Sequence, residues 1–250
     1  ETNGDMGENP RNVSAKLDTI YDVASLTKAF ATTPAVLRLW EKGKLGLDDK
    51  VSKYIPKFSG SDRDFITIRQ LLTHTSGLRP DISLKGWNGH AECIAKCCAE
   101  TPRHPPGTVF VYSDINFQLL DEIVRCVSGR RLDAFCQKEI FGPLKMTDTG
   151  YNPPASKRGR VAPNTFEDDQ WLRGTVHDPR ARKTSGVAGH AGLFTTASDL
   201  ARFCRMLLND GELDGDRIFK KETVIEWTRI QAPDMRDAKG RPALRALGLD

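Results

Sequence analysis

The chain has 250 residues, a formal net charge of +4 and 38% hydrophobic residues, which is enough for one sizeable core or two closely packed subdomains. The charge is spread along the chain. Its one dense basic run, SKRGR at 156–160, has no interleaved aromatic residues, so nucleic acid is not expected as a partner. No apolar stretch is long enough to span a bilayer, and the polar start, ETNGDMGENPRNVSAKL, has no signal-peptide core.

The first chemical feature is a serine and a lysine three positions apart in YDVASLTKAF, residues 21–30. The residues before Ser25 are typical of a strand, and those after it have helical spacing over about 26–42. One helical turn separates Ser25 from Lys28, so their side chains share a face. Ser25 is either a nucleophile with Lys28 as its base or an ordinary helix N-cap, and this stretch alone does not decide between them. Pro34 should kink or break the helix, and Gly43 should cap its end.

The next predicted elements lie in DFITIRQLLTHTSGL, residues 64–78. A short extended entry leads into a helix that Gly77 closes. His74 and Ser76 are candidate catalytic residues, but capping explains His-Thr-Ser-Gly at a helix end well, and capping is the interpretation we favour.

A second chemical feature is Tyr112, in PPGTVFVYSDINFQLL at 105–120. TVFVYSD at 108–114 resembles a strand or extended stretch, and a long helix follows it. Tyr112 would stand at this strand-to-helix junction, either packed as a half-buried aromatic or exposed in a site. Together with Ser25 and Lys28, its hydroxyl would complete a set that can perform acyl transfer without histidine.

Six cysteines, at 93, 97, 98, 126, 136 and 204, fit no zinc-binding pattern. Cys126 and Cys204 occupy apolar positions of helical runs, where free cysteine behaves as a small hydrophobe. We therefore expect mostly unpaired core thiols, with 93, 97 and 98 the least certain.

Two further segments differ sharply in periodicity. Residues 151–185 have little periodicity and predict a long structured loop. TASDLARFCRMLLNDG at 196–211 predicts an amphipathic helix, capped by Thr196 or Ser198 and ended by Gly211. Its expected apolar face consists of Leu200, Phe203, Leu207 and Leu208.

Four ordered blocks carry a family resemblance: IYDVASLTKAFATT, ITIRQLLTHTSGL, PPGTVFVYSDINFQLL and VHDPRA followed by GVAGHAGLFTTASDLARF. Over about residues 15–250 the chain resembles the serine β-lactamase-like superfamily, in the branch of class C β-lactamases, D-alanyl-D-alanine carboxypeptidases and penicillin-binding-protein-like esterases. By this resemblance Ser25 is the nucleophile, and Lys28 and Tyr112 are its proton-transfer partners. The implied fold is α/β of the α+β type, an antiparallel sheet flanked by helices with a helical subdomain.

Two departures from the family pattern affect the predicted site. Asp114 stands where the second motif usually has asparagine, which replaces an amide donor by an anion; we assign Asp114 to substrate binding. The third motif, Lys-Thr-Gly or His-x-Gly, is expected after Asp250. RKTSG at 182–186 and GHAG at 189–192 resemble it but precede LFTTASDLARF, so Lys183 and Thr184 are predicted to be loop residues. His190 is assigned to substrate binding in the cleft.

The resemblance implies a single β-lactamase-related domain over 1–250, truncated at both ends, and a mostly helical chain because terminal strands are absent. The implied activity is that of a serine hydrolase acting on an ester, amide or D-amino-acid peptide bond, and the chain by itself is expected to be inactive. The alternative is a slow or non-catalytic penicillin- or peptidoglycan-binding module. The expected partner is a small-molecule or peptide substrate, with no cofactor and no metal, in the periplasm or secreted. The sequence predicts no oligomeric state.

Overall fold

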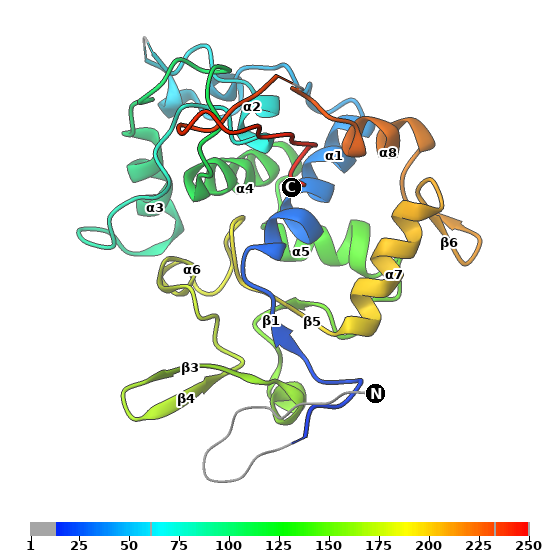
Figure 1. Ribbon diagram of the computed structural model, residues 1–250. Helices are drawn as coiled ribbons and strands as arrows, with labels where there is room; N and C mark the ends of the chain where they lie inside the picture. Colours follow the sequence, from blue (N-terminus) through cyan, green and yellow to red (C-terminus); the bar gives the residue numbers. More distant parts are fainter. Residues whose placement is uncertain (1–13, 61, 233, 250) are drawn as a thin grey trace.

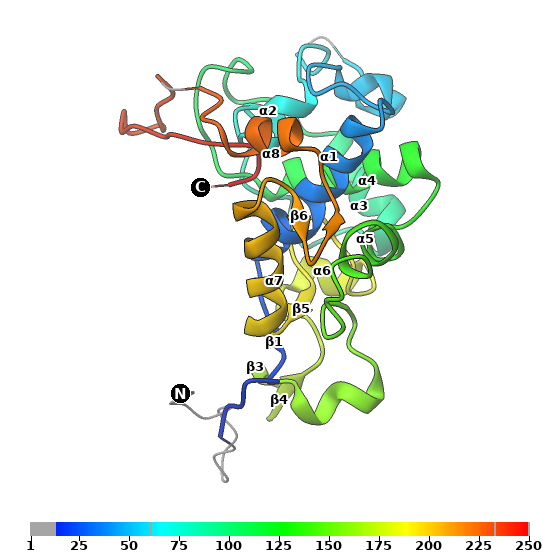
Figure 2. The same ribbon diagram turned by 90° about the vertical axis from the view of Figure 1, so that its right-hand side faces the viewer.

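The structure, a computed structural model, describes residues 14–60, 62–232 and 234–249 (Figure 1). The polar segment at 1–13, including most of the predicted N-terminal stretch, lies outside the described residues. A mainly helical part holds α1 to α5 and α8, and a smaller part holds the strands β1 and β5 with α7 alongside them (Figures 1 and 2). The candidate site residues come from segments where these two parts meet.

The helices account for most of the regular structure. The α-helices are α1 (Thr33–Glu41), α2 (Ile68–Leu72), α3 (Gly89–Cys98), α4 (Asp114–Ser128), α5 (Leu132–Cys136), α6 (Pro179–Lys183), α7 (Ala197–Leu208) and α8 (Lys221–Thr228). Two π-helical turns, η1 (Lys28–Thr32) and η4 (Gln137–Phe141), and three short 3₁₀ turns, η2 (Val51–Lys53), η3 (Pro56–Phe58) and η5 (Ala155–Arg160), complete the set. No helix in the described ranges is both long and apolar enough to cross a membrane.

Within the described ranges, the strands form three small antiparallel sheets. The central one has the order β1 (Tyr21–Asp22), β5 (Leu193–Thr195), β2 (Gly150–Tyr151). Tyr21 pairs with Thr195, and Gly150 pairs with Phe194. Two hairpins, β3 (Pro163–Glu167) with β4 (Gln170–Arg173) and β6 (Glu212–Leu213) with β7 (Asp216–Arg217), lie outside it. Because β5 pairs with β1, the segment before β5 lies beside the turn that follows β1.

The helix predicted over 26–42 is present but changes character along its length. It opens as the π-helical turn η1 and becomes α1 at Thr33, with Pro34 in the first turn. Proline is tolerated there because the first backbone N–H groups of a helix have no partner within it. Gly43 follows with a φ of 65°, which fits the predicted glycine cap.

The helix predicted in ITIRQLLTHTSGL is α2, which begins with a capping box between Thr67 and Gln70. The capping expected of His74 and Ser76 is present in the turn that ends α2: the Thr75 N–H donates to the Gln70 backbone oxygen, and Ser76 Oγ accepts from the Leu78 N–H at 3.2 Å. His74 has a φ of 57° just beyond the helix, and its ring is buried. The Ser76 hydroxyl is buried too and donates to Asn116 Oδ1 at 2.7 Å. Both side chains point into the protein, toward α4.

Other expectations need correction. Of the two alternatives at 108–114, a strand is not formed: Phe110 makes an isolated bridge to Asp237, Ser113 is extended, and Asp114 already belongs to α4. The predicted loop at 151–185 contains β3, β4 and α6. On α7, Phe203 is buried but Leu208 is 88% exposed, because Met206 takes the inward position instead.

All six cysteines are free, as expected, but only four are buried. Cys126 and Cys204 are exposed, so their assignment to the core is wrong. The remaining four belong to one large apolar cluster that joins α1, α2, α3, α4 and α5. A smaller cluster of Ile20, Val161, Val176, Ala181, Ala188, Ala191 and Phe194 packs beside the central sheet. Helix α4 runs through the large cluster and ends at Gly129, whose φ of 69° allows a left-handed cap.

Candidate active site

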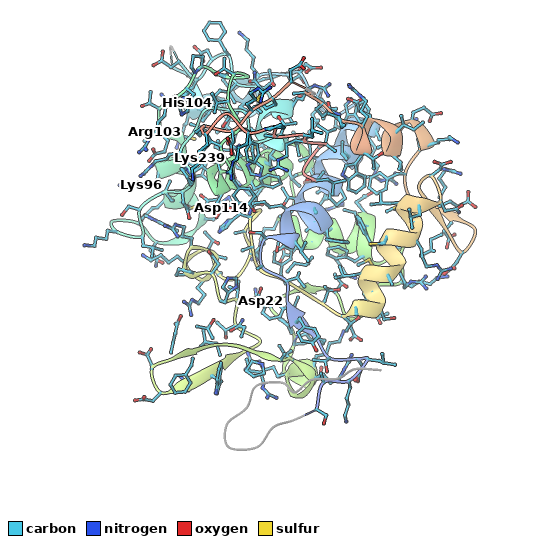
Figure 3. All side chains as sticks on the ribbon, viewed as in Figure 1. Asp22, Lys96, Arg103, His104, Asp114 and Lys239 are labelled. Carbon is cyan, nitrogen blue, oxygen red and sulfur yellow. The ribbon has the colours of Figure 1, made fainter. Side chains whose placement is uncertain are left out.

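Ser25 is exposed in the turn between β1 and the helix that contains Lys28. Asp22, the last residue of β1, has a buried side chain that accepts hydrogen bonds from this turn and from the segment at His177 (Figure 3). Its Oδ1 accepts from the backbone N–H of Ala24 at 2.9 Å, and its Oδ2 accepts from the backbone N–H of His177 at 2.8 Å. Ala24 has a φ of 48°, which is uncommon for a residue with a Cβ. The chain therefore presents Ser25 on a tight, held turn.

Lys28 is 3% exposed, and its ammonium group lies among three oxygen atoms. Its Nζ is 3.1 Å from Ser25 Oγ, 3.2 Å from the backbone oxygen of His190 and 2.7 Å from Asp114 Oδ1. The contact with Ser25 spans one helical turn, as the sequence spacing predicts. The other two partners arrive from residues far away in the sequence. Lys28 belongs to the π-helical turn η1, a local widening that often occurs at functional sites.

Tyr112 covers one side of the lysine. The Lys28 Nζ lies 4.7 Å from the centre of the Tyr112 ring, within the range of a cation–π contact. Behind Tyr112, the His74 ring stacks at 4.4 Å between centroids with an interplanar angle of 27°. Tyr112 is 37% exposed, and among the described residues its hydroxyl has no hydrogen-bond partner. The Tyr112 ring is thus positioned by its contacts with Lys28 and His74, and no described residue forms a hydrogen bond with its hydroxyl oxygen.

His74 is a neutral imidazole in this arrangement. Burial, together with the positive charges of Lys28 and Arg245, lowers the pKa of His74 to about 3. Its Nδ1 accepts from the backbone N–H of Ser113 at 2.9 Å, which assigns the proton to Nε2. His74 therefore fixes the backbone just before α4 and supports the ring of Tyr112, but it is not a base near neutral pH.

Ser25, Lys28 and Tyr112 line one cleft of about 520 Å³. His74 and the apolar residues around Ser25 form its walls together with Gly248 and Leu249. Asp114, the first residue of α4, lies in the middle of the molecule beside this region (Figure 3). The predicted catalytic residues are therefore brought together in a space that admits a small acyl compound.

The other sequence-predicted residues take different positions. His190 is 2% exposed and is not one of the residues that line the cleft. It reaches Lys28 through its backbone oxygen, while its Nε2 lies 3.0 Å from Asp178 Oδ1. Lys183 ends α6 and donates to the Trp87 backbone oxygen at 2.8 Å, so its amine is engaged elsewhere.

Sequence reasoning missed Asp22, the support role of His74, and the pair formed by Asp81 and Arg180. Arg180 Nε is 2.8 Å from Asp81 Oδ2. Burial raises the pKa of Asp81 to about 6; Arg180 opposes this rise and the negative charge of Asp114 adds to it. The Asp114 carboxylate is thus close enough to Asp81 for the two negative charges to interact. No local sequence signal marks this pair, since its two members lie about a hundred positions apart.

No group of three or more His, Cys, Asp or Glu side chains in the described part of the chain is arranged to hold a metal ion.

The fold is that of the β-lactamase and penicillin-binding class of proteins. The model of the Beta-lactamase family matches residues 4–248, and the chain belongs to this family. Its fold resembles a class C β-lactamase, with a TM-score of 0.70 and 27% identity over 88% of this chain and 57% of the other. It also resembles a penicillin-binding protein homologue from Caulobacter crescentus, with a TM-score of 0.75 and 25% identity over 96% of this chain and 69% of the other.

Two sequence relatives carry functional names. A protein of Escherichia coli K12, provisionally named as a D-alanyl-D-alanine carboxypeptidase, is 33% identical over 89% of this chain. A protein of Bacillus subtilis strain 168, named N-acetylmuramyl-L-alanine amidase, is 31% identical over 92% of this chain. The chain spans 58% and 59% of the length of these two proteins. The family and its named relatives are hydrolases.

Proposed function

We propose that the protein is a serine hydrolase that works through an acyl-enzyme formed on Ser25. The observation that carries the proposal is the 3.1 Å contact between Lys28 Nζ and Ser25 Oγ in a cleft that Tyr112 also lines. A nucleophilic serine needs a proton-transfer partner within hydrogen-bond reach, and this contact places the Lys28 amine in that position. The substrates would be an ester, an amide or a D-amino-acid peptide bond, and export to the periplasm or secretion is part of the proposal.

In the first step, Ser25 Oγ forms a bond to the substrate carbonyl carbon. The hydroxyl proton passes to the Lys28 and Tyr112 pair and then to the leaving group, whose bond to carbon breaks. In the second step, water attacks the ester on Ser25 and gives its proton to the same pair. The serine oxygen takes this proton back as the acid is released, so atoms and charges balance over the cycle.

The oxyanion of the tetrahedral intermediate needs backbone donors. The N–H group of Ser25 has no hydrogen-bond partner among the described residues, so it is free to serve as one donor. Asp114 and His190 are proposed as substrate-binding residues. Asp114 would do so with its carboxylate beside Lys28, whereas the geometry of His190 favours a contribution through the backbone segment 189–191 rather than its buried ring.

The direct test is the Ser25→Ala variant of the full-length protein. It should lose both turnover of a p-nitrophenyl ester and labelling by a fluorophosphonate or fluorescent penicillin. Its unfolding free energy should stay within about 1 kcal/mol of the wild type, because Ser25 is exposed. Ser198→Ala, at an exposed serine of α7, is the matched control and should keep full activity. Wild-type ester hydrolysis by Ser25→Ala would refute the assignment of the nucleophile.

One observation favours a slower, penicillin-binding function as the second candidate. The Asp114 carboxylate forms a 2.7 Å ion pair with Lys28, whose Nζ donates to Ser25 Oγ in this structure. Burst kinetics with a chromogenic ester or β-lactam separate the two functions. An enzyme continues after the burst, whereas a binding module stops after one equivalent. Asp114→Asn should speed acylation if the ion pair is what limits it.

A further inference from the structure

A second cavity, of about 600 Å³, lies in the helical part of the protein. It is bounded by α3, α4, the start of α5, and the segments 54–57 and 184–187. It shares no lining residue with the cleft that contains Ser25. Most of its wall is apolar, including Ile94, Leu132 and Val187. A cavity of this size and lining is typical of a small-molecule site.

Two neighbouring carboxylates of α4 face this cavity, and their surroundings differ. Glu122 accepts two hydrogen bonds from Arg125, each at 2.7 Å, and lies 2.8 Å from His90 Nε2. Burial opposes ionisation of Glu122, but these contacts outweigh it and lower its pKa to about 2. The charge of Glu122 is therefore fully compensated within the protein.

Asp121 is 4% exposed, and its carboxylate accepts no hydrogen bond from any described residue. Its nearest cationic partner is His90 Nδ1 at 3.9 Å, beyond hydrogen-bond reach. Burial is the main reason that the pKa of Asp121 is raised, to about 6. A buried carboxylate is costly unless donors satisfy it, and here the acceptor sites are open toward the cavity.

We propose that this cavity is a second ligand site, which binds a small primary amine with an apolar body. The ammonium group would donate to the Asp121 carboxylate, and the body would pack among Ile94, Leu132 and Val187. An anion of the same shape would meet the uncompensated charge of Asp121. It would find no free counter-charge at Arg125, whose guanidinium is already bound to Glu122. Lys57 and Arg131 also line the cavity, and Arg131 is paired with Asp133 at 3.2 Å, so the preference for a cation rests on the buried Asp121 carboxylate.

The site is separate from the catalytic one although both adjoin α4. Asp114, at the first residue of this helix, faces Lys28, and Asp121 lies two turns further along. The segment at Gly189 separates them: a Cβ added there would lie 2.0 Å from the Phe117 backbone oxygen and 3.0 Å from Asp121 Cβ. The second cavity and the catalytic cleft can therefore be occupied at the same time.

Isothermal titration calorimetry of the full-length protein with 2-phenylethylamine tests the proposal. We expect saturable binding with a dissociation constant on the order of 1 mM, as is usual for so small a ligand. 3-Phenylpropionate, which keeps the apolar body and reverses the charge, should bind at least about tenfold more weakly. Equal affinity for the two compounds, or no binding of the amine, would overturn the proposal.

Three variants locate the site. Asp121→Asn should weaken amine binding at least about tenfold, and its Tm without ligand should rise because a buried charge is removed. Asp169→Asn is the control; it removes an equal charge from the exposed turn between β3 and β4, outside the cavity, and should leave affinity unchanged. Ala95→Phe places a ring in the cavity from the exposed side of α3 and should abolish binding. Wild-type affinity in Asp121→Asn or in Ala95→Phe would show that the amine binds elsewhere and would refute the site.

Discussion

Replacing His74 by asparagine should remove a large part of the acid sensitivity of this protein. The His74 ring is buried beneath Tyr112 and accepts a hydrogen bond from the Ser113 backbone, so it is neutral in the folded state. Its pKa falls from an ordinary value of 6.5 to about 3 because of burial first, and then because of the charges of Lys28 and Arg245. Asparagine tolerates the left-handed backbone at this position, where φ is 57°.

The direction and size of the effect follow from proton linkage. Below about pH 6.5 the unfolded chain binds a proton at His74, whereas the folded protein does so only near pH 3. The stability that depends on neutral His74 is therefore complete above pH 6.5 and is lost as the pH falls toward 3. Between about pH 7 and about pH 5 the loss is ~2 kcal/mol, since each pKa unit corresponds to about 1.4 kcal/mol.

Urea unfolding of the wild type and His74→Asn at these two pH values measures the difference. The variant should lose about 2 kcal/mol less than the wild type on acidification. His90→Gln is the contrasting control. Its hydrogen bond to Glu122 raises the pKa of His90, so its contribution is present at low pH and is lost as the pH rises. The His90→Gln variant should therefore lose more unfolding free energy than the wild type between about pH 7 and about pH 5. Equal acid losses in His74→Asn and the wild type would refute the buried neutral imidazole.

Three further predictions concern the site and its support. Lys28→Ala and Tyr112→Phe should each lower kcat by about a hundredfold or more, and the double variant should lose far less than the product. Losses that simply multiply would mean that one of the two residues has only a structural role. Gly189→Ala should lower the unfolding free energy by about 1–3 kcal/mol, because its Cβ would lie 2.0 Å from the Phe117 backbone oxygen; an unchanged Tm would contradict that close approach. Thr67→Ala should cost about 1 kcal/mol in urea unfolding through loss of the capping box, and no change would show that the cap is dispensable.

Short-range features of this protein were accessible from the sequence. The spacing of Ser25 and Lys28 predicts a shared helical face, and their Oγ and Nζ atoms lie 3.1 Å apart. Pro34, Gly43 and Thr196 mark helix boundaries through backbone geometry and capping that depend on a few neighbouring residues. The family resemblance also predicted the mainly helical fold with its small antiparallel sheet.

Only the tertiary structure decided which distant groups meet. The partners of Lys28 at Asp114 and at the His190 backbone come from α4 and from the segment before β5. Periodicity also failed at Cys126 and Leu208, since it shows which face of a helix is apolar but not how far the neighbouring elements cover that face. Likewise, residues 108–114 have strand-like composition but lack a neighbouring strand to complete their hydrogen bonds. Local composition encodes backbone preference, whereas burial and long-range pairing depend on what the rest of the chain brings alongside.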